Sequence, residues 1–167
     1  VAQTASLAMW NGTTWQSMGT GWTGTTRQSV WCMATWNNRL YIGGGIVNTP
    51  ALIAGQPWAG MASWDGSAWT PTISTVGGSF SPFISAMQVF NDGSGEAVYI
   101  AGRFTSINGV PGTAGIARWN GTAWSAVGGG LTSTSTLFGP EAMTVFDDGT
   151  GPALYVGGYA FFASGMA

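Results

Sequence analysis

Few residues of this chain have side chains able to do acid–base or nucleophilic chemistry. Among 167 residues there are four arginines and a single cysteine, with no histidine and no lysine. General acid–base catalysis would therefore fall to carboxylates, tyrosines or the thiol. Glu141 is the one acid that stands apart from the predicted hairpin loops and repeat motifs, and it has no obvious partner for the two-carboxylate chemistry of glycoside hydrolysis. We expect no catalysis from this chain. The six acids are Asp65, Asp92, Glu96, Glu141, Asp147 and Asp148.

Two acidic loops are the candidate metal sites of the sequence. The loop NDGSGE contains Asp92 and Glu96, and the loop DDGTG contains Asp147 and Asp148. Calcium takes about six to eight oxygen ligands, several of them from carboxylates in a glycine-containing loop. Neither loop has the alternating acids of a full calcium loop, so the sequence favours hairpin connections and weak calcium candidates at most. We expect no metal and no cofactor.

The lone cysteine, Cys32, excludes a disulfide framework and paired-thiol metal sites. It lies in an apolar run where two similar runs have Ala86 and Ala142, which favours a small buried thiol. A catalytic cysteine would require a histidine partner, and the chain has none.

Charge and hydropathy exclude further classes of function. The formal net charge is −2, which leaves no basic surface for a phosphate backbone, so we expect no nucleic-acid partner. No apolar run approaches the roughly 18–20 residues of a membrane-spanning helix. A surface rich in Gly, Ser and Thr and free of Lys indicates a secreted protein.

The motif Trp-(Asn/Asp)-Gly-x-x-Trp occurs three times, and it is the strongest signal in the chain. Its first tryptophan is Trp10, Trp64 and Trp119, so the period is 54 and then 55 residues. A second block recurs in register with it and aligns on Met33, Met87 and Met143, on Trp36, Phe90 and Phe146, and on Tyr41, Tyr99 and Tyr155. We infer one segment, 1–167, built of repeat units at approximately 1–54, 55–109 and 110–167.

Each repeat contains four short apolar runs separated by turn residues. In the second copy the runs are MASW, AWTPTI, SAMQVF and AVYIAG, and Asp-Gly pairs or Gly/Ser-rich loops lie between them. Such runs predict strands and hairpins, and no stretch has the spacing of a helix over three turns. A two-residue type I′ turn is expected at each Asn-Gly or Asp-Gly pair. Four antiparallel strands at a period near 50 predict an all-β chain built as a segment of a β-propeller.

These residues resemble a known family. The runs LYIGGG and LYVGG, followed by a strand that ends in IARWNG and a second Trp, are similar to kelch repeats. The resemblance is closest to secreted bacterial tandem repeats of the form Phe-Asp-Asp-Gly…Leu-Tyr-Val-Gly-Gly…Ile-Ala-Arg-Trp-Asn-Gly…Trp. It implies that the strand with Met33, Met87 or Met143 is the innermost of each blade. The Tyr-x-Gly strand, the Ala-Arg-Trp strand and an edge strand then follow in order.

That strand order implies about three blades' worth of sheet. Two blades are complete, and two outer strands near 7–16 and two inner strands near 142–158 form complementary halves. Because an incomplete ring leaves strand edges unpaired, we expect the partners to be other propeller segments, either the rest of a longer chain or further copies.

If the repeats are scaffold, recognition is expected in the longer connections, where the copies differ. The large or charged residues there are the candidate ligand-binding residues: Trp22, Arg27, Trp58, Phe80 and Phe83. The alternative is that Trp22 and Trp58 pack their own loops. The repeated Trp and Gly residues are expected to be structural.

We therefore expect a non-catalytic module, extracellular or on a bacterial cell surface, that acts in protein interaction or scaffolding of an assembly. A carbohydrate-binding, lectin-like propeller is the alternative. A third hypothesis is part of an enzyme whose catalytic residues lie outside this segment.

Overall fold

The computed structural model describes residues 6–19, 22–23, 28–45, 52–78, 81–133, 139–159 and 161–164. These residues form strands and turns and contain no helix, so the all-β prediction is confirmed. In the described ranges, no helix has the length and apolarity that a membrane crossing requires.

Two antiparallel sheets of four strands form the centre of the molecule. Sheet I has the order β4-β5-β8-β9 and sheet II the order β11-β12-β14-β15, which is the order expected for the repeats. Their strands are β4 (Val30–Trp36), β5 (Arg39–Gly44), β8 (Met61–Trp64), β9 (Trp69–Pro71), β11 (Phe83–Asn91), β12 (Glu96–Arg103), β14 (Ile116–Trp119) and β15 (Trp124–Ala126).

Two further antiparallel pairs correspond to the two predicted half units. β1 (Met9–Trp10) pairs with β2 (Trp15–Gln16), and these strands occupy the repeat positions of β8 and β9. β17 (Pro140–Asp147) pairs with β18 (Pro152–Gly158), and these occupy the positions of β4 and β5. The chain thus contains an outer pair, two four-stranded sheets and an inner pair.

The long connections pair with each other in each repeat, which the sequence analysis did not predict. β3 (Trp22–Thr23) pairs with β6 (Leu52–Ile53), and β6 pairs with β7 (Gln56–Pro57). β10 (Val76–Gly77) likewise pairs with β13 (Ser106–Ile107), and β16 (Leu131–Ser133) with β19 (Phe161–Ala163). The loops expected to vary therefore share a common structural plan.

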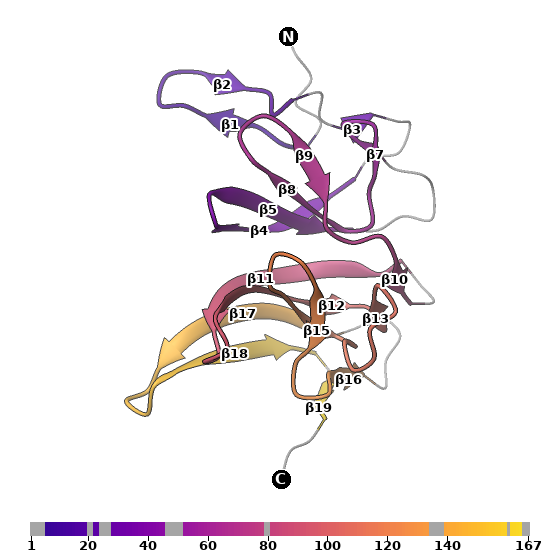
Figure 1. The fold of residues 1–167 in the computed structure, drawn as a ribbon, viewed down its shortest axis with the longest axis vertical. Coiled ribbons are helices and arrows are strands. Elements are labelled where there is room, and N and C mark those ends of the chain that lie inside the picture. The colour runs from indigo at the N-terminus through magenta and orange to yellow at the C-terminus, as the bar shows by residue number, and fades with distance from the viewer. Residues whose placement is uncertain are drawn as a thin grey trace.

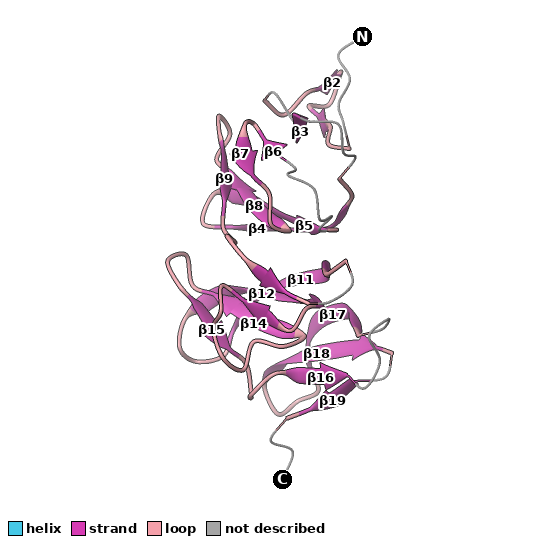
Figure 2. Ribbon diagram, turned by 90° about the vertical axis from the view of Figure 1, so that its right-hand side faces the viewer, coloured by secondary structure: helices cyan, strands magenta, loops and turns pink. Residues whose placement is uncertain are grey.

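The sheets follow one another along the long axis of the molecule (Figures 1 and 2). β11 lies between β4 and β17, so successive repeats contact through their first long strands. One core joins sheets I and II around Met61, Ile84 and Ile100, all fully buried. A second core, around Ile42, Ile53 and Ala62, joins sheet I to Leu7 and Met18, which flank β1 and β2.

Each first long strand has a β-bulge opposite a glycine. The register shifts between Val30 and Cys32, between Ile84 and Ala86, and between Pro140 and Ala142. The residue opposite the start of each bulge is Gly44, Gly102 or Gly158. A Cβ on Gly102 would collide with the carbonyl oxygen of Phe83 and lie 2.9 Å from the Cα of Ile84. The second glycine of the Tyr-x-Gly-Gly run is thus required by close backbone approach.

The turns within the Trp motif differ from the predicted two-residue type. Trp10 pairs directly with Trp15, so four residues connect the strands, and among them only Gly12 has a positive φ, of 101°. The side-chain oxygen of Asn11 accepts hydrogen bonds from the amides of Thr13 and Thr14, at 2.9 and 2.8 Å. Since the Asn side chain itself bonds the turn backbone, the loop closes as an Asx turn and needs no second left-handed residue.

Candidate functional site

The paired tryptophans of the repeat motif lie directly opposite each other and join neighbouring repeats. The ring centroids of Trp64 and Trp69 are 5.1 Å apart, as are those of Trp119 and Trp124. In both of these pairs the second tryptophan is buried, and its indole N–H donates to a carbonyl of the preceding repeat. Trp69 donates to Met18 at 3.0 Å and Trp124 to Thr72 at 2.9 Å. These contacts agree with the structural role expected for the motif.

Three residues, Trp31, Ser85 and Glu141, occupy the bulge position of β4, β11 and β17, and we call them the bulge residues. The backbone around them repeats, whereas their side chains are an indole, a hydroxyl and a carboxylate. Bulges re-aim a side chain and are frequent beside functional sites. The bulge residues therefore place three different chemistries at equivalent points of adjacent strands.

Trp31 packs against Phe83 at the junction of sheets I and II. Its ring centroid lies 4.6 Å from that of Phe83, and 51% of its surface is exposed. The guanidinium carbon of Arg103 lies 4.8 Å from the centroid of the Phe83 ring, within the range of a cation–π contact. Arg103 also donates to the carbonyl of Ser81 at 2.7 Å, which holds the guanidinium in place. We call Trp31, Phe83 and Arg103 the aromatic platform.

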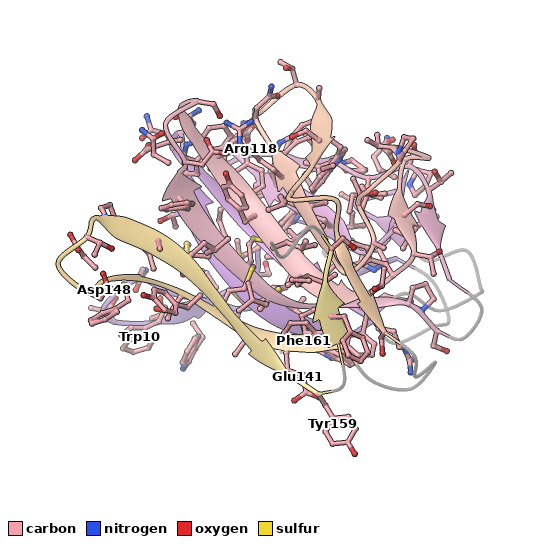
Figure 3. The ribbon with its side chains drawn as sticks, turned by 90° about the horizontal axis from the view of Figure 1, so that it is seen from below. Trp10, Arg118, Glu141, Asp148, Tyr159 and Phe161 are labelled. Atoms are coloured by element: carbon pink, nitrogen blue, oxygen red, sulfur yellow. The ribbon has the colours of Figure 1, made fainter. Side chains whose placement is uncertain are left out.

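The other two bulge residues have different surroundings. The hydroxyl of Ser85 donates to the carbonyl of Pro140 at 2.6 Å and lies 3.1 Å from that of Ala101, so it links β11 to β17. Glu141 is exposed, and it projects away from the ribbon at the same margin of the molecule as Tyr159 (Figure 3). The bulge of β17 thus presents an open carboxylate, whereas that of β11 is used for packing.

The five loop residues singled out from the sequence do not form one described cluster. Arg27 and Phe80 lie outside the described residues, and only the backbone of Trp22 is described, in β3. Trp58 is buried, with 7% exposure, and its indole N–H donates to the carbonyl of Gly45 at 3.0 Å. Its position agrees with the alternative that Trp58 packs its own loop. Phe83 belongs to the aromatic platform.

The sequence analysis did not single out Trp31 or Arg103, although a signal was present. Trp31 precedes the aligned residues Cys32, Ala86 and Ala142, so it shares a repeat position with Ser85 and Glu141. A position at which each copy has a different side chain, inside an otherwise repeated strand, is one that the common packing of the repeats does not dictate. Comparing single positions within strands, as well as whole loops, identifies it.

The acidic loops use their carboxylates to close hairpin turns. The Oδ1 of Asp92 accepts from the amide of Ser94 at 3.0 Å, and its Oδ2 accepts from the hydroxyl of Tyr99 at 2.8 Å. These hydrogen bonds, chiefly those from Ser94, lower the pKa of Asp92 to about 2. Asp147 accepts from the amides of Gly149 and Gly151 at 2.8 and 3.0 Å. Among the described residues, no group of three or more His, Cys, Asp and Glu side chains is placed to hold a metal ion.

A shallow depression lies at the opposite, turn end of sheet I and is lined by residues 35–40 and 64–66. There Arg39 donates to the hydroxyl of Ser63 at 3.2 Å and forms an ion pair with Asp65 at 3.6 Å. Hydrogen bonds from the amides of Ala68 and Ser67 lower the pKa of Asp65 to about 2. The charged groups of this depression, Arg39 and Asp65, are paired with each other, with Ser63 and with the turn amides. We therefore do not assign a binding or catalytic role to it.

Cys32 is half-buried between sheets I and II. Its thiol lies 3.8 Å from the carbonyl oxygen of Ile84, and burial raises its pKa to about 12. A thiol with so high a pKa is protonated at neutral pH and is a poor nucleophile. The position therefore serves packing between the strands.

The chain was compared with protein-family models, curated proteins and solved structures. No family model, no curated protein and no solved structure matches the chain.

Proposed function

We propose that the chain is a kelch-like β-propeller segment that acts outside the cell, without catalysis of its own, as a protein-interaction or scaffolding module. In this proposal, sheets I and II are complete blades, and the pairs β1-β2 and β17-β18 are the outer and inner halves of two others. The order of strands within each sheet supports it, as does the contact of successive sheets through β4, β11 and β17. The extracellular location rests on composition.

The observation that carries the interaction function is the exposure of residues whose repeat equivalents are buried. Tyr155 of β18 is 43% exposed, whereas Tyr41 and Tyr99 are 3% and 1% exposed. At the other end Trp15 is 68% exposed, whereas its equivalent Trp69 is 5% exposed. Aromatic residues are enriched at protein interfaces, and an unpaired strand edge is a template for another chain. Both ends of the described fold therefore favour contact with further repeats.

Light scattering after size-exclusion chromatography tests this function, because one chain carries both open edges. We expect a mass above that of one chain at concentrations of about 100 µM, and a return to the mass of one chain in Tyr155→Lys, since charged edge residues oppose strand pairing. Thr132→Lys, an exposed substitution in β16, is the matched control. A folded chain that keeps the mass of one chain at every concentration would contradict self-association through these edges, and the proposed function would then require another propeller segment as partner.

Carbohydrate binding is the second candidate, and the aromatic platform is the observation that favours it. The half-exposed ring of Trp31 provides an open apolar face, and the neighbouring ring of Phe83 has the guanidinium of Arg103 over it. A glycan array read with the wild type and with Trp31→Ala tests it. Trp10→Ala is the control, because Trp10 has the same 51% exposure at a different place. Binding lost only in Trp31→Ala would favour this function over scaffolding.

Four of the six described carboxylates are engaged in their own turns and give no support to a catalytic role. Asp65, Asp92, Asp147 and Asp148 each accept hydrogen bonds from backbone amides of their own turns. Groups used in this way are structural, and the proposal that this segment is not itself an enzyme rests on them and on the lack of histidine.

A further inference from the structure

No described strand covers the outer edge of β18, and the equivalent edge of β12 in sheet II shows which residues a covering strand needs. In sheet II, β12 is covered by β14, with Val98 opposite Trp119, Tyr99 opposite Arg118 and Ile100 opposite Ala117. β18 is the repeat equivalent of β12, and among the described strands it pairs with β17 alone. A covering strand in the same register would set its residues opposite Leu154, Tyr155 and Val156.

The hairpin turns before β12 and β18 are built alike. Ser94 donates its amide to Asp92 at 3.0 Å, and Thr150 donates its amide to Asp148 at 3.1 Å. The hydroxyl of the following Tyr99 donates to Asp92 at 2.8 Å, and the equivalent Tyr155 is the smallest of the hydrogen-bonding causes that lower the pKa of Asp148. Asp148 lies at the tip of the β17–β18 hairpin (Figure 3). The two turns therefore present an Asp carboxylate held by the same amide and hydroxyl hydrogen bonds, from Ser94 in one turn and from Thr150 in the other.

In sheet II an arginine of the covering strand completes this arrangement. The guanidinium of Arg118 lies 3.7 Å from the Oδ2 of Asp92 and donates to the carbonyl of Gly95 at 3.0 Å. Its side chain is 13% exposed. Within the part of the chain that the structure describes, Asp148 has no ion pair. The Asp148 turn thus holds the acid of this cluster without the base.

Sheet I lacks both the acidic turn and the arginine of the covering strand. Its turn, Asn37-Asn38, has no acid, and its covering strand has Ser63 in place of Arg118. The charges are exchanged in sheet I. Arg39 lies in the covered strand β5, and it contacts Ser63 in the covering strand β8 and Asp65 in the turn that follows β8. β1 of this chain has Met9 at the covering position. A second copy joined through β1 would therefore leave Asp148 without a cation.

We propose, on the basis of the proposed interaction function, that the edge of β18 receives a β-hairpin whose first strand sets an arginine opposite Tyr155, against Asp148. The occupant has the chemistry of residues 116–126: an apolar residue, Ala, Arg and Trp, then an Asx turn and a second strand that begins with Trp. Backbone hydrogen bonds along β18 supply the affinity of such strand addition, and the arginine supplies the selectivity. The ring of Tyr155 becomes buried under the hairpin, as that of Tyr99 is.

Synthetic peptides test the selectivity with the full chain as receptor. A dye-labelled peptide of residues 114–127 is compared, by fluorescence anisotropy, with the same peptide carrying Arg118→Met. We expect the arginine peptide to bind about threefold to tenfold more tightly, a difference that salt reduces because the pair is partly exposed. Amide hydrogen exchange locates the contact, with slowed exchange expected in residues 153–157.

The receptor variant Asp148→Asn completes a double-mutant cycle. It should weaken the arginine peptide by the same factor and leave the methionine peptide unchanged, because the amide keeps the turn but not the charge. Equal binding of both peptides to the wild type overturns the arginine assignment. So does an Asp148→Asn variant that binds the arginine peptide as tightly as the wild type does. A peptide of residues 5–18 that binds more tightly than 114–127 overturns it in favour of a second copy. If no peptide binds while the chain still self-associates, this inference fails and the proposed function stands. If neither occurs, both fail.

Discussion

The indole N–H of Trp124 donates to the carbonyl oxygen of Thr72 across 2.9 Å, although the two residues are 52 positions apart. The bond joins the outer strand of sheet II to the chain that leaves sheet I. Trp69 makes the equivalent bond to Met18 one repeat earlier. A motif that looks local in the sequence therefore acts between repeats.

We expect Trp124→Phe to lower the free energy of unfolding by about 1–2 kcal/mol, because the carbonyl of Thr72 loses its donor while most of the aromatic volume remains. Trp124→Ala should cost about 3–5 kcal/mol, since it also opens a cavity. Urea unfolding followed by circular dichroism measures both. The control is Trp15→Phe, at the same motif position but 68% exposed, which should change stability by less than about 0.5 kcal/mol. Similar losses at Trp124 and Trp15 would contradict the role of the interrepeat bond.

The two glycines at the end of β18 should respond differently to the same small change. A Cβ on Gly158 would collide with the carbonyl oxygen of Gly139 and lie 2.7 Å from the Cα of Pro140, whereas a Cβ on Gly157 meets nothing within 4 Å. We expect Gly158→Ala to destabilise the fold by more than about 2 kcal/mol through a forced backbone shift. Gly157→Ala should be nearly neutral, as Ala101 at that position in sheet II suggests. Thermal unfolding of the two variants compares them, and equal effects would exclude the bulge as the cause.

The sequence predicted the elements whose cause is local or repeated. Alternating apolar runs and turn residues were enough to identify the strands of both four-stranded sheets, and their order followed from the resemblance to kelch-like repeats. The period identified the two half units at the ends. The turn between Trp10 and Trp15 was predicted wrongly, because the side chain of Asn11 does the work assigned to a second left-handed residue. That competition between side chain and backbone is not visible in residue type alone.

The candidate site was harder to predict, because it is assembled across repeats. Trp31 and Phe83 are 52 positions apart and meet only because β4 and β11 pack side by side. The pairing of Val76 with Ile107 joins two loops that are far apart in the sequence, so no turn motif between them predicts it. Variation in loop sequence does not mark exposure here, because Trp58 of a long connection is buried whereas Trp31, at the bulge of a repeated strand, is half exposed.

The thiol of Cys32 should be nearly inert in the folded chain. Burial raises its pKa to about 12, so at pH 8 the thiolate fraction is roughly a thousandfold below that of a free cysteine. Iodoacetamide labelling followed by mass spectrometry should accordingly be very slow in buffer and fast in urea. Cys32→Ala should change stability little, since Ala86 and Ala142 occupy the same repeat position. Fast labelling without denaturant would show that sheets I and II separate readily.

Stability should fall in acid through the turn carboxylates. Hydrogen bonds from Ser94 and Tyr99 lower the pKa of Asp92 to about 2 in the folded chain, whereas an unfolded Asp titrates near about 3.9. Because the folded pKa is the lower one, this contribution is complete above pH 4 and is lost as the pH falls from about 4 towards 2. The urea midpoint should therefore drop over that interval, and less steeply in Asp92→Asn. Tyr99→Phe keeps the carboxylate but removes one donor, so it should reduce the drop by an intermediate amount. A pH dependence identical in the wild type and in both variants would show that the Asp92 turn does not contribute to acid unfolding.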